Sequence, residues 1–172
     1  SAAGCVLLRA PLDTPPAPAA VLLAPQAIGP CDSLQLDATT STGGGGRPMR
    51  FAWTAAVDSA QITSSANLQA ASASLPAIQA ALDVASEADQ GRVTLDGALL
   101  PGGSAFSFTV VAGHFLSGQT GNRTLAVRVA EEPVPSNQID GAAVRTIRRD
   151  QSLRLSMFAR ASSCGDDTSA GK

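Results

Sequence analysis

The amino-acid sequence predicts a mainly β protein, a β-sandwich with one short helix inserted among its strands. Several segments alternate apolar and polar residues with the period of two that half-buried strands show, and turn residues separate them. Apolar residues reach 44% but aromatic residues only 3%, and Ala, Ser, Gly and Thr are abundant. We therefore expect a core that is built largely from small side chains.

The first strands are expected in the forty residues after a proline-rich stretch. Ala20 to Leu23 is a short apolar segment, and Ser33 to Asp37 alternates polar and apolar residues. Thr42 to Arg47 contains four consecutive glycines, which indicates a turn or a loop. The strongest strand signal is Phe51 to Val57, whose odd-numbered residues share one face.

Three later segments continue this pattern, and they are Arg92 to Leu95, Ser104 to Phe115 and Thr124 to Ala130. A turn at Pro101 to Gly103 precedes the second of them. The large aromatic residues on the inward faces are expected to anchor the core, and they are Phe51, Trp53, Phe106 and Phe108.

A helix is expected between these strands. Ser74 is a suitable N-cap, Pro76 falls in the first turn, and Ile78 and Leu82 follow at helical spacing until Gly91. The sequence thus predicts one short helical insert in an otherwise β fold.

Proline-rich stretches divide the chain into three parts. We expect residues 1–18 to be a linker or the end of a preceding module, 19–132 to be the sandwich, and 133–172 to begin a second, similar β module. Strands are predicted there at Ala143 to Ile147 and Leu153 to Ala159, but about forty residues are too few to close a sandwich. Since the sequence begins at Ser1 without a leader, we expect a piece of a longer protein.

Charge and hydropathy exclude two classes of partner. Charged residues are 15% of the chain and the net charge is −2, so the electrostatic attraction that nucleic-acid binding needs is missing. No apolar run reaches the roughly 18 to 20 residues that cross a bilayer. We expect neither nucleic-acid binding nor membrane contact by this segment.

The three cysteines are Cys5, Cys31 and Cys164. They form no closely spaced pair of the kind that binds metal or carries redox chemistry, so disulfide use is the better interpretation. Cys5 with Cys31 is the pairing we favour, but the sequence leaves the connectivity open, and the odd number implies a free thiol or an outside partner.

Few residues suggest catalysis or ligand binding. His114, the only histidine, has no recognisable nucleophile or acid beside it in the sequence, so we interpret it as a strand-end residue. Gly43 to Gly46 lacks the Lys-Ser or Lys-Thr of a phosphate-binding loop. Calcium is a minority hypothesis for five aspartates, Asp32, Asp37, Asp58, Asp166 and Asp167. Asp37 is expected instead to stabilise its own turn.

The sequence contains two further features that are expected at the surface. Asn122-Arg123-Thr124 is an acceptor for N-glycosylation, expected at a turn into a strand. A basic cluster, Arg145, Arg148 and Arg149, is either a contact for an acidic partner or simply solvated. No catalytic residue, metal ligand or cofactor is predicted.

The run from Gly29 to Trp53 resembles the start of a REJ module, the receptor-for-egg-jelly type related to the immunoglobulin-like repeats of polycystic kidney disease (PKD) proteins. It combines a strand Leu34-Gln35-Leu36-Asp37-Ala38, a glycine-rich turn and a strand with an aromatic residue two before Trp53. The resemblance covers residues 20 to about 132. The WDFGDG motif of the plain PKD repeat is absent, which favours the REJ type.

This resemblance implies an immunoglobulin-like sandwich of a large modular surface protein, like those of polycystin-like receptors and of green algal ciliary or cell-surface proteins. The function it implies is a non-enzymatic extracellular structural or adhesion module. Its expected partners are neighbouring modules or other surface glycoproteins, and glycans. A ligand- or force-sensing receptor ectodomain and an accessory domain of a secreted hydrolase remain open as alternatives, because sandwiches host many functions.

Overall fold

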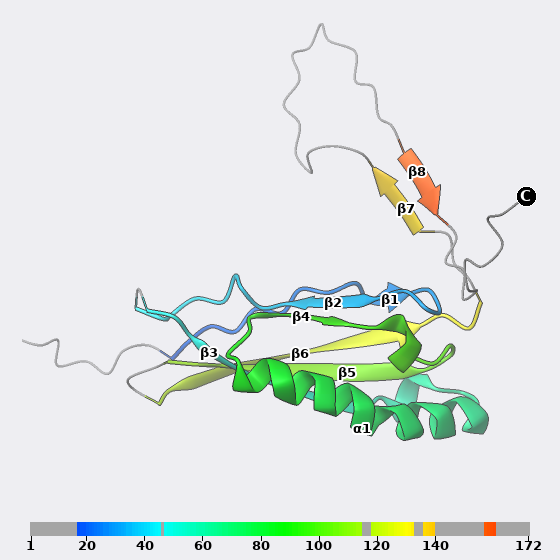
Figure 1. The fold of residues 1–172 in the computed structure, drawn as a ribbon, viewed down its shortest axis with the longest axis horizontal. Helices are drawn as coiled ribbons and strands as arrows, with labels where there is room; N and C mark the ends of the chain where they lie inside the picture. Colours follow the sequence, from blue (N-terminus) through cyan, green and yellow to red (C-terminus); the bar gives the residue numbers. More distant parts are fainter. Residues whose placement is uncertain (1–16, 46, 115–117, 133–135, 140–156, 161–172) are drawn as a thin grey trace, which may run out of the picture.

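The computed structural model describes residues 17–45, 47–114 and 118–132, and the strands at 136–139 and 157–160. The described chain is mostly β-sheet with one long helix (Figure 1). One sheet has four strands in the order β1 (Ala27–Ile28), β6 (Thr120–Val129), β5 (Ala105–Gly113) and β3 (Arg50–Val57). A second sheet pairs β2 (Leu34–Asp37) with β4 (Arg92–Leu95). This architecture is compatible with the predicted β-sandwich.

The core contains the inward side chains of both sheets. β3, β5 and β6 are antiparallel neighbours, so alternate residues of each point to the same face. All four expected anchors are buried, with Trp53 at 1% exposure and Phe106 and Phe108 at 0%. Leu34 and Leu36 of β2, both fully buried, belong to the same cluster. The apolar residues of the alternating pattern thus lie on the buried face of these strands, and the polar residues lie on the exposed face.

The helix is longer than the sequence predicted. α1 spans Ser65–Glu87 with Ser64 as its N-cap residue, so the predicted cap at Ser74 is wrong by ten residues, and Pro76 lies in the helix interior. Proline there removes one backbone hydrogen bond. The helix continues through it because Pro76 is exposed while Ala71 and Ile78, on either side, are buried against the sheets. The chain makes a short 3₁₀ turn in each of two connections. η1 (Ser59–Gln61) lies between β3 and α1, and η2 (Gly97–Leu99) lies between β4 and β5.

Helix α1 covers the outer edge of β3, and its side chains bond to the strand's backbone. The Trp53 N–H donates to Ser86 Oγ at 2.9 Å, and the Ala55 N–H donates to Gln79 Oε1 at 3.0 Å. Gln79 Nε2 in turn donates to the Trp53 carbonyl at 3.3 Å. An exposed strand edge invites pairing with another chain, so these contacts close one edge of the four-stranded sheet.

The segment 19–26 passes from one sheet to the other on the opposite side of the fold. It touches the β2 side through isolated bridges, Ala19 with Thr42 and Leu23 with Asp37. After Pro25 the chain joins β6 as the parallel strand β1. The continuous strand predicted at Ala20 to Leu23 is therefore wrong: the segment meets the β2 side only at isolated bridges, and the chain changes sheets after Pro25.

The last two strands form a separate pair. β7 (Ser136–Ile139) and β8 (Met157–Arg160) are antiparallel and make a two-stranded sheet. β8 overlaps the end of the predicted strand at Leu153 to Ala159, whereas the predicted strand at Ala143 to Ile147 lies outside the described residues.

Candidate functional site

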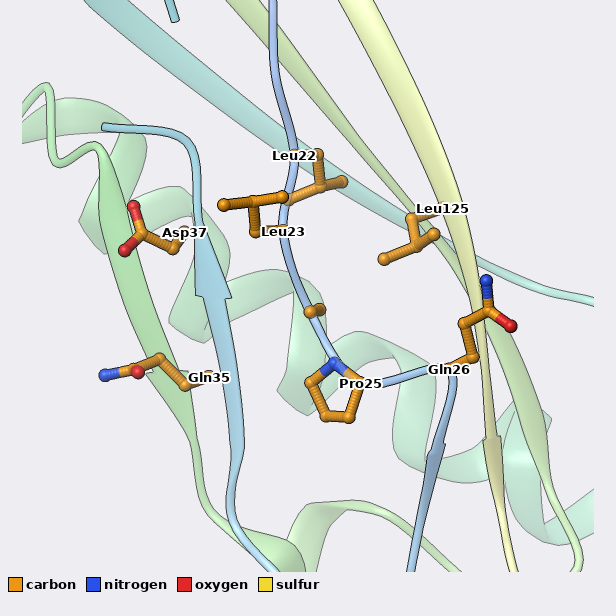
Figure 2. A pocket seen from close by; sticks show the side chains of 8 residues that line it. Leu22, Leu23, Pro25, Gln26, Gln35, Asp37 and Leu125 are labelled. Carbon is orange, nitrogen blue, oxygen red and sulfur yellow. The ribbon is translucent and has the colours of Figure 1, made fainter. Parts of the chain in front are cut away.

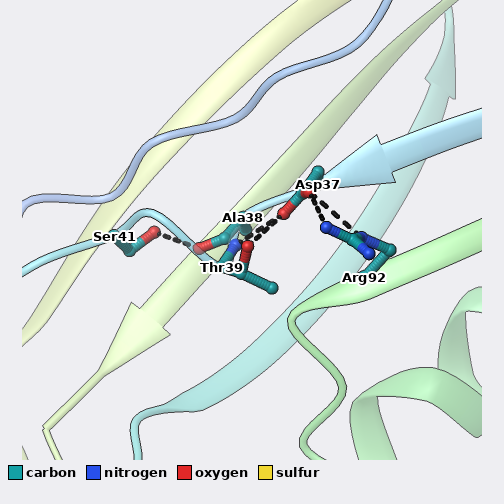
Figure 3. Close-up of polar contacts among 5 residues, drawn as sticks. All are labelled: Asp37, Ala38, Thr39, Ser41 and Arg92. Atoms are coloured by element: carbon teal, nitrogen blue, oxygen red, sulfur yellow. Dashed lines mark hydrogen bonds and ion pairs between the residues drawn. The ribbon is translucent and has the colours of Figure 1, made fainter.

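Asp37, at the end of β2, is the centre of a small polar cluster (Figure 3). Its Oδ1 accepts hydrogen bonds from the Thr39 N–H at 2.9 Å and the Thr39 hydroxyl at 2.6 Å. This is the turn-stabilising role expected from the sequence. Its Oδ2 accepts from Arg92 Nη2 at 2.6 Å and Nε at 3.0 Å. The sequence pattern did not reveal this ion pair, because only the β2–β4 register brings the two residues together.

These contacts favour the ionised form of Asp37. The Thr39 hydroxyl and N–H, followed by Arg92, lower the pKa of its carboxyl group from the ordinary 3.8 to about 2. Because the folded state holds the proton less tightly than the unfolded chain, the stabilisation is fully present above about pH 4. It is lost as the pH falls towards 2. The cluster is therefore a structural clasp between β2, β4 and the following turn.

The other described aspartates are also engaged locally. Asp32 Oδ2 accepts from the Gly29 N–H at 3.0 Å, and Asp58 Oδ2 accepts from Gln61 Nε2 at 2.9 Å. Within the part of the chain that the structure describes, no three His, Cys, Asp or Glu side chains group as metal ligands. Asp166 and Asp167 lie outside that part.

His114 follows the end of β5 and is half-buried. Its backbone N–H donates to the Gln119 carbonyl at 2.8 Å, which extends the β5–β6 pairing by one step. The three residues of the basic cluster, Arg145, Arg148 and Arg149, lie outside the described residues.

Asn122 lies within β6, not at the turn that the sequence suggested. Its neighbour across the sheet is Val111, and its side chain is exposed. Thr124, the third residue of the acceptor tripeptide, is also exposed, and its hydroxyl shares a 2.7 Å hydrogen bond with that of Thr109. The acceptor asparagine is thus accessible on the outer face of the four-stranded sheet.

Cys31 is exposed and disulfide-bonded, and its backbone adopts a left-handed φ of 65°. Its partner is one of the two cysteines outside the described residues, Cys5 or Cys164. Gly97 of η2 packs against this turn so closely that a Cβ would overlap the Cys31 backbone. The turn that bears the disulfide is therefore closely packed against η2.

A shallow hollow lies where segment 19–26 crosses between the sheets (Figure 2). Its volume is about 560 Å³, and its wall comes from both sheets and from the crossing segment. The residues that line it are Leu22, Leu23, Ala24, Pro25, Gln26, Gln35, Asp37 and Leu125. Leu23 is 53% exposed, an unusual degree for a leucine beside the core. The hollow is mainly apolar, with Asp37 and two glutamines at its margin.

A second hollow of about 300 Å³ lies beside the start of α1. Its lining is more polar and includes Gln61, Asn67, Arg128 and Glu131. Ser104, the most buried polar residue there, already donates its hydroxyl hydrogen to the Pro101 carbonyl at 2.6 Å. Nothing in this second hollow marks a bound ligand.

Comparisons with known proteins yielded no match to any family model, curated protein or solved structure. Among the described residues, α1 is the longest helix, and no helix has the length and apolar character needed to cross a membrane.

Proposed function

We propose that this chain is a non-enzymatic extracellular module of a large modular surface protein, with an immunoglobulin-like sandwich of the REJ or PKD type. It contributes to protein–protein assembly at a cell or ciliary surface. Its sheets supply a rigid body, and its exposed edges, loops and glycans make the contacts.

The order of the strands supports the immunoglobulin-like part of this proposal. In that fold, the second and fifth strands pair in one sheet, while the third, sixth and seventh form the other. Here β2 pairs with β4, and β3, β5 and β6 lie side by side opposite them. α1 occupies the connection between β3 and β4, where immunoglobulin domains carry further strands. The first strand changes sheets at Pro25.

The disulfide at Cys31 is the observation that carries the extracellular assignment. Disulfides form and persist in secreted and surface proteins and are rare in the reducing cytosol. The accessible acceptor Asn122 agrees with passage through the secretory pathway, where N-glycans are added.

Peptide mapping of the native protein without reduction tests this proposal. We expect a Cys31-containing peptide that is joined to a second cysteine, and a glycan mass on the peptide with Asn122. As a matched control, the reduced sample should release the Cys31 peptide alone. Quantitative alkylation of Cys31 in the unreduced native protein, together with an unmodified Asn122, would contradict an extracellular module.

A further inference from the structure

The four-stranded sheet has one closed edge and one open edge. At β3, side chains of α1 bond the edge groups of Trp53 and Ala55. At the other end of the sheet, β1 covers β6 only at Arg128 and Val129. Among the residues that the structure describes, no strand pairs with the rest of the β6 edge.

The hydrogen-bond alternation shows which β6 residues face that edge. In an antiparallel pair, only every second residue bonds to the neighbouring strand. The Val129 N–H donates to the Ser104 carbonyl, and the Gln119 carbonyl accepts from the His114 N–H. The backbone N–H and C=O groups of the odd-numbered residues of β6 therefore point towards β5. The N–H and C=O groups of Asn122, Thr124 and Ala126 therefore point away from β5. Among the described residues, no hydrogen bond joins these groups to another strand.

The open stretch has a defined length. Its far end is closed where the Arg128 N–H donates to the Gln26 carbonyl at 2.9 Å, and β6 itself begins at Thr120. The stretch from Asn122 to Ala126 is symmetric about Thr124. Two such stretches fit together antiparallel, with each Thr124 opposite the other and each Asn122 opposite Ala126. In this register, Arg128 of one copy lies opposite Thr120 of the other copy, which is the first residue of β6. The pairing therefore ends where β1 begins to cover β6.

We propose that a second copy of this chain pairs with β6 along this edge and joins the two four-stranded sheets into one continuous sheet. The proposal rests on the proposed function as an assembly module and identifies its contact surface. Three edge residues from each copy supply the backbone hydrogen bonds, in the strand-addition mode that many sheet proteins use.

The side chains next to the edge are complementary in this register. Arg123 is exposed, and it takes part in no ion pair within the described part of the chain. In the paired register it comes opposite Leu125 of the other copy, beside the hollow that Asp37 lines. The aliphatic part of an arginine thus meets the apolar wall of the hollow, and its guanidinium lies near a margin of two glutamines and the Asp37 carboxylate, which Arg92 already pairs. On the outer face, Thr124 lies opposite Thr124 and Asn122 opposite Ala126, and these side chains project from the sheet and not into the seam between the strands.

Sedimentation of the full 172-residue chain over a concentration series tests the pairing. We expect reversible association to dimers in the wild type. Thr124→Pro removes one edge N–H without breaking a bond to β5, and proline is tolerated at such edge positions. It should weaken association roughly tenfold or more. Thr124→Ala keeps the N–H but loses the hydroxyl contact with Thr109 and, like Thr124→Pro, the glycan acceptor at Asn122. It is therefore the matched control, and it should associate like wild-type chain that carries no glycan.

A cysteine at the symmetry centre reports the register directly. Thr124→Cys should form a covalent dimer under mild oxidation, since opposed residues in such pairs lie within disulfide reach. Thr54→Cys is the matched control, because Thr54 is exposed in the same cross-strand row but lies on β3, whose edge α1 covers. It should crosslink no more than the wild type, whose native cysteines set the background.

A wild type that stays monomeric throughout the series would overturn the edge pairing. So would equal association of a folded Thr124→Pro variant, or equal crosslinking by the Thr54→Cys control. None of these outcomes affects the disulfide and glycan test of the extracellular module, so the two proposals fail separately.

Discussion

Gln79→Ala tests whether the helix contributes energetically to the closed edge of the four-stranded sheet. Gln79 accepts from the Ala55 N–H at 3.0 Å and donates to the Trp53 carbonyl at 3.3 Å. The substitution leaves both backbone groups without their partner, next to a tryptophan that is 1% exposed. At about 1 kcal/mol for each lost hydrogen bond, the free energy of unfolding should fall by about 2 kcal/mol.

Gln69→Ala is the matched control. Gln69 lies in the same helix and is exposed, and none of the hydrogen bonds of the described residues involves its side chain. Both variants change helix propensity equally, so their difference reports the two bonds to the strand together with the exposed bond from Gln79 Nε2 to Asp83 Oδ1 at 2.7 Å, which is worth only a few tenths of a kcal/mol. Urea unfolding, followed by the fluorescence of Trp53, measures the difference in the free energy of unfolding between the two variants. A Gln79→Ala variant within about 0.5 kcal/mol of the control would refute the reasoning, because water would then satisfy the edge equally well.

Three further predictions concern the core and the clasp. Gly121→Ala places a Cβ on the Pro18 carbonyl oxygen and should lower the thermal midpoint clearly, while Gly113→Ala, with only ordinary contacts, should change it little. Trp53→Phe loses the 2.8 Å bond from Nε1 to the Gln90 carbonyl and leaves a gap, so about 2 to 4 kcal/mol of stability should disappear in urea unfolding. In Asp37→Asn, the free energy of unfolding should depend less on pH between pH 4 and 2. The wild type loses roughly 1 kcal/mol of it over that range, after allowance for solvent screening. An unchanged acid profile would show that the clasp does not contribute.

The local pattern of the sequence was sufficient for most strands. β2, β3 and β4 were predicted close to their observed bounds, because alternation at period two directly reflects which side chains a sheet buries. The same pattern identified the four aromatic residues that are buried in the core. The role of Asp37 in its turn was also predictable, since its partner Thr39 is two residues away.

The residue pattern alone indicated strands β2 to β6 and the large side chains that they bury, whereas β1 and β7 were not predicted. Tertiary structure decided how far α1 extends, where segment 19–26 changes sheets, and that Arg92 reaches Asp37 across 55 positions. It also decided which edge of the sheet α1 closes and which one stays open. The physical reason is that alternation is a local property of the chain, whereas edges, ion pairs and helix ends depend on residues that only packing brings together.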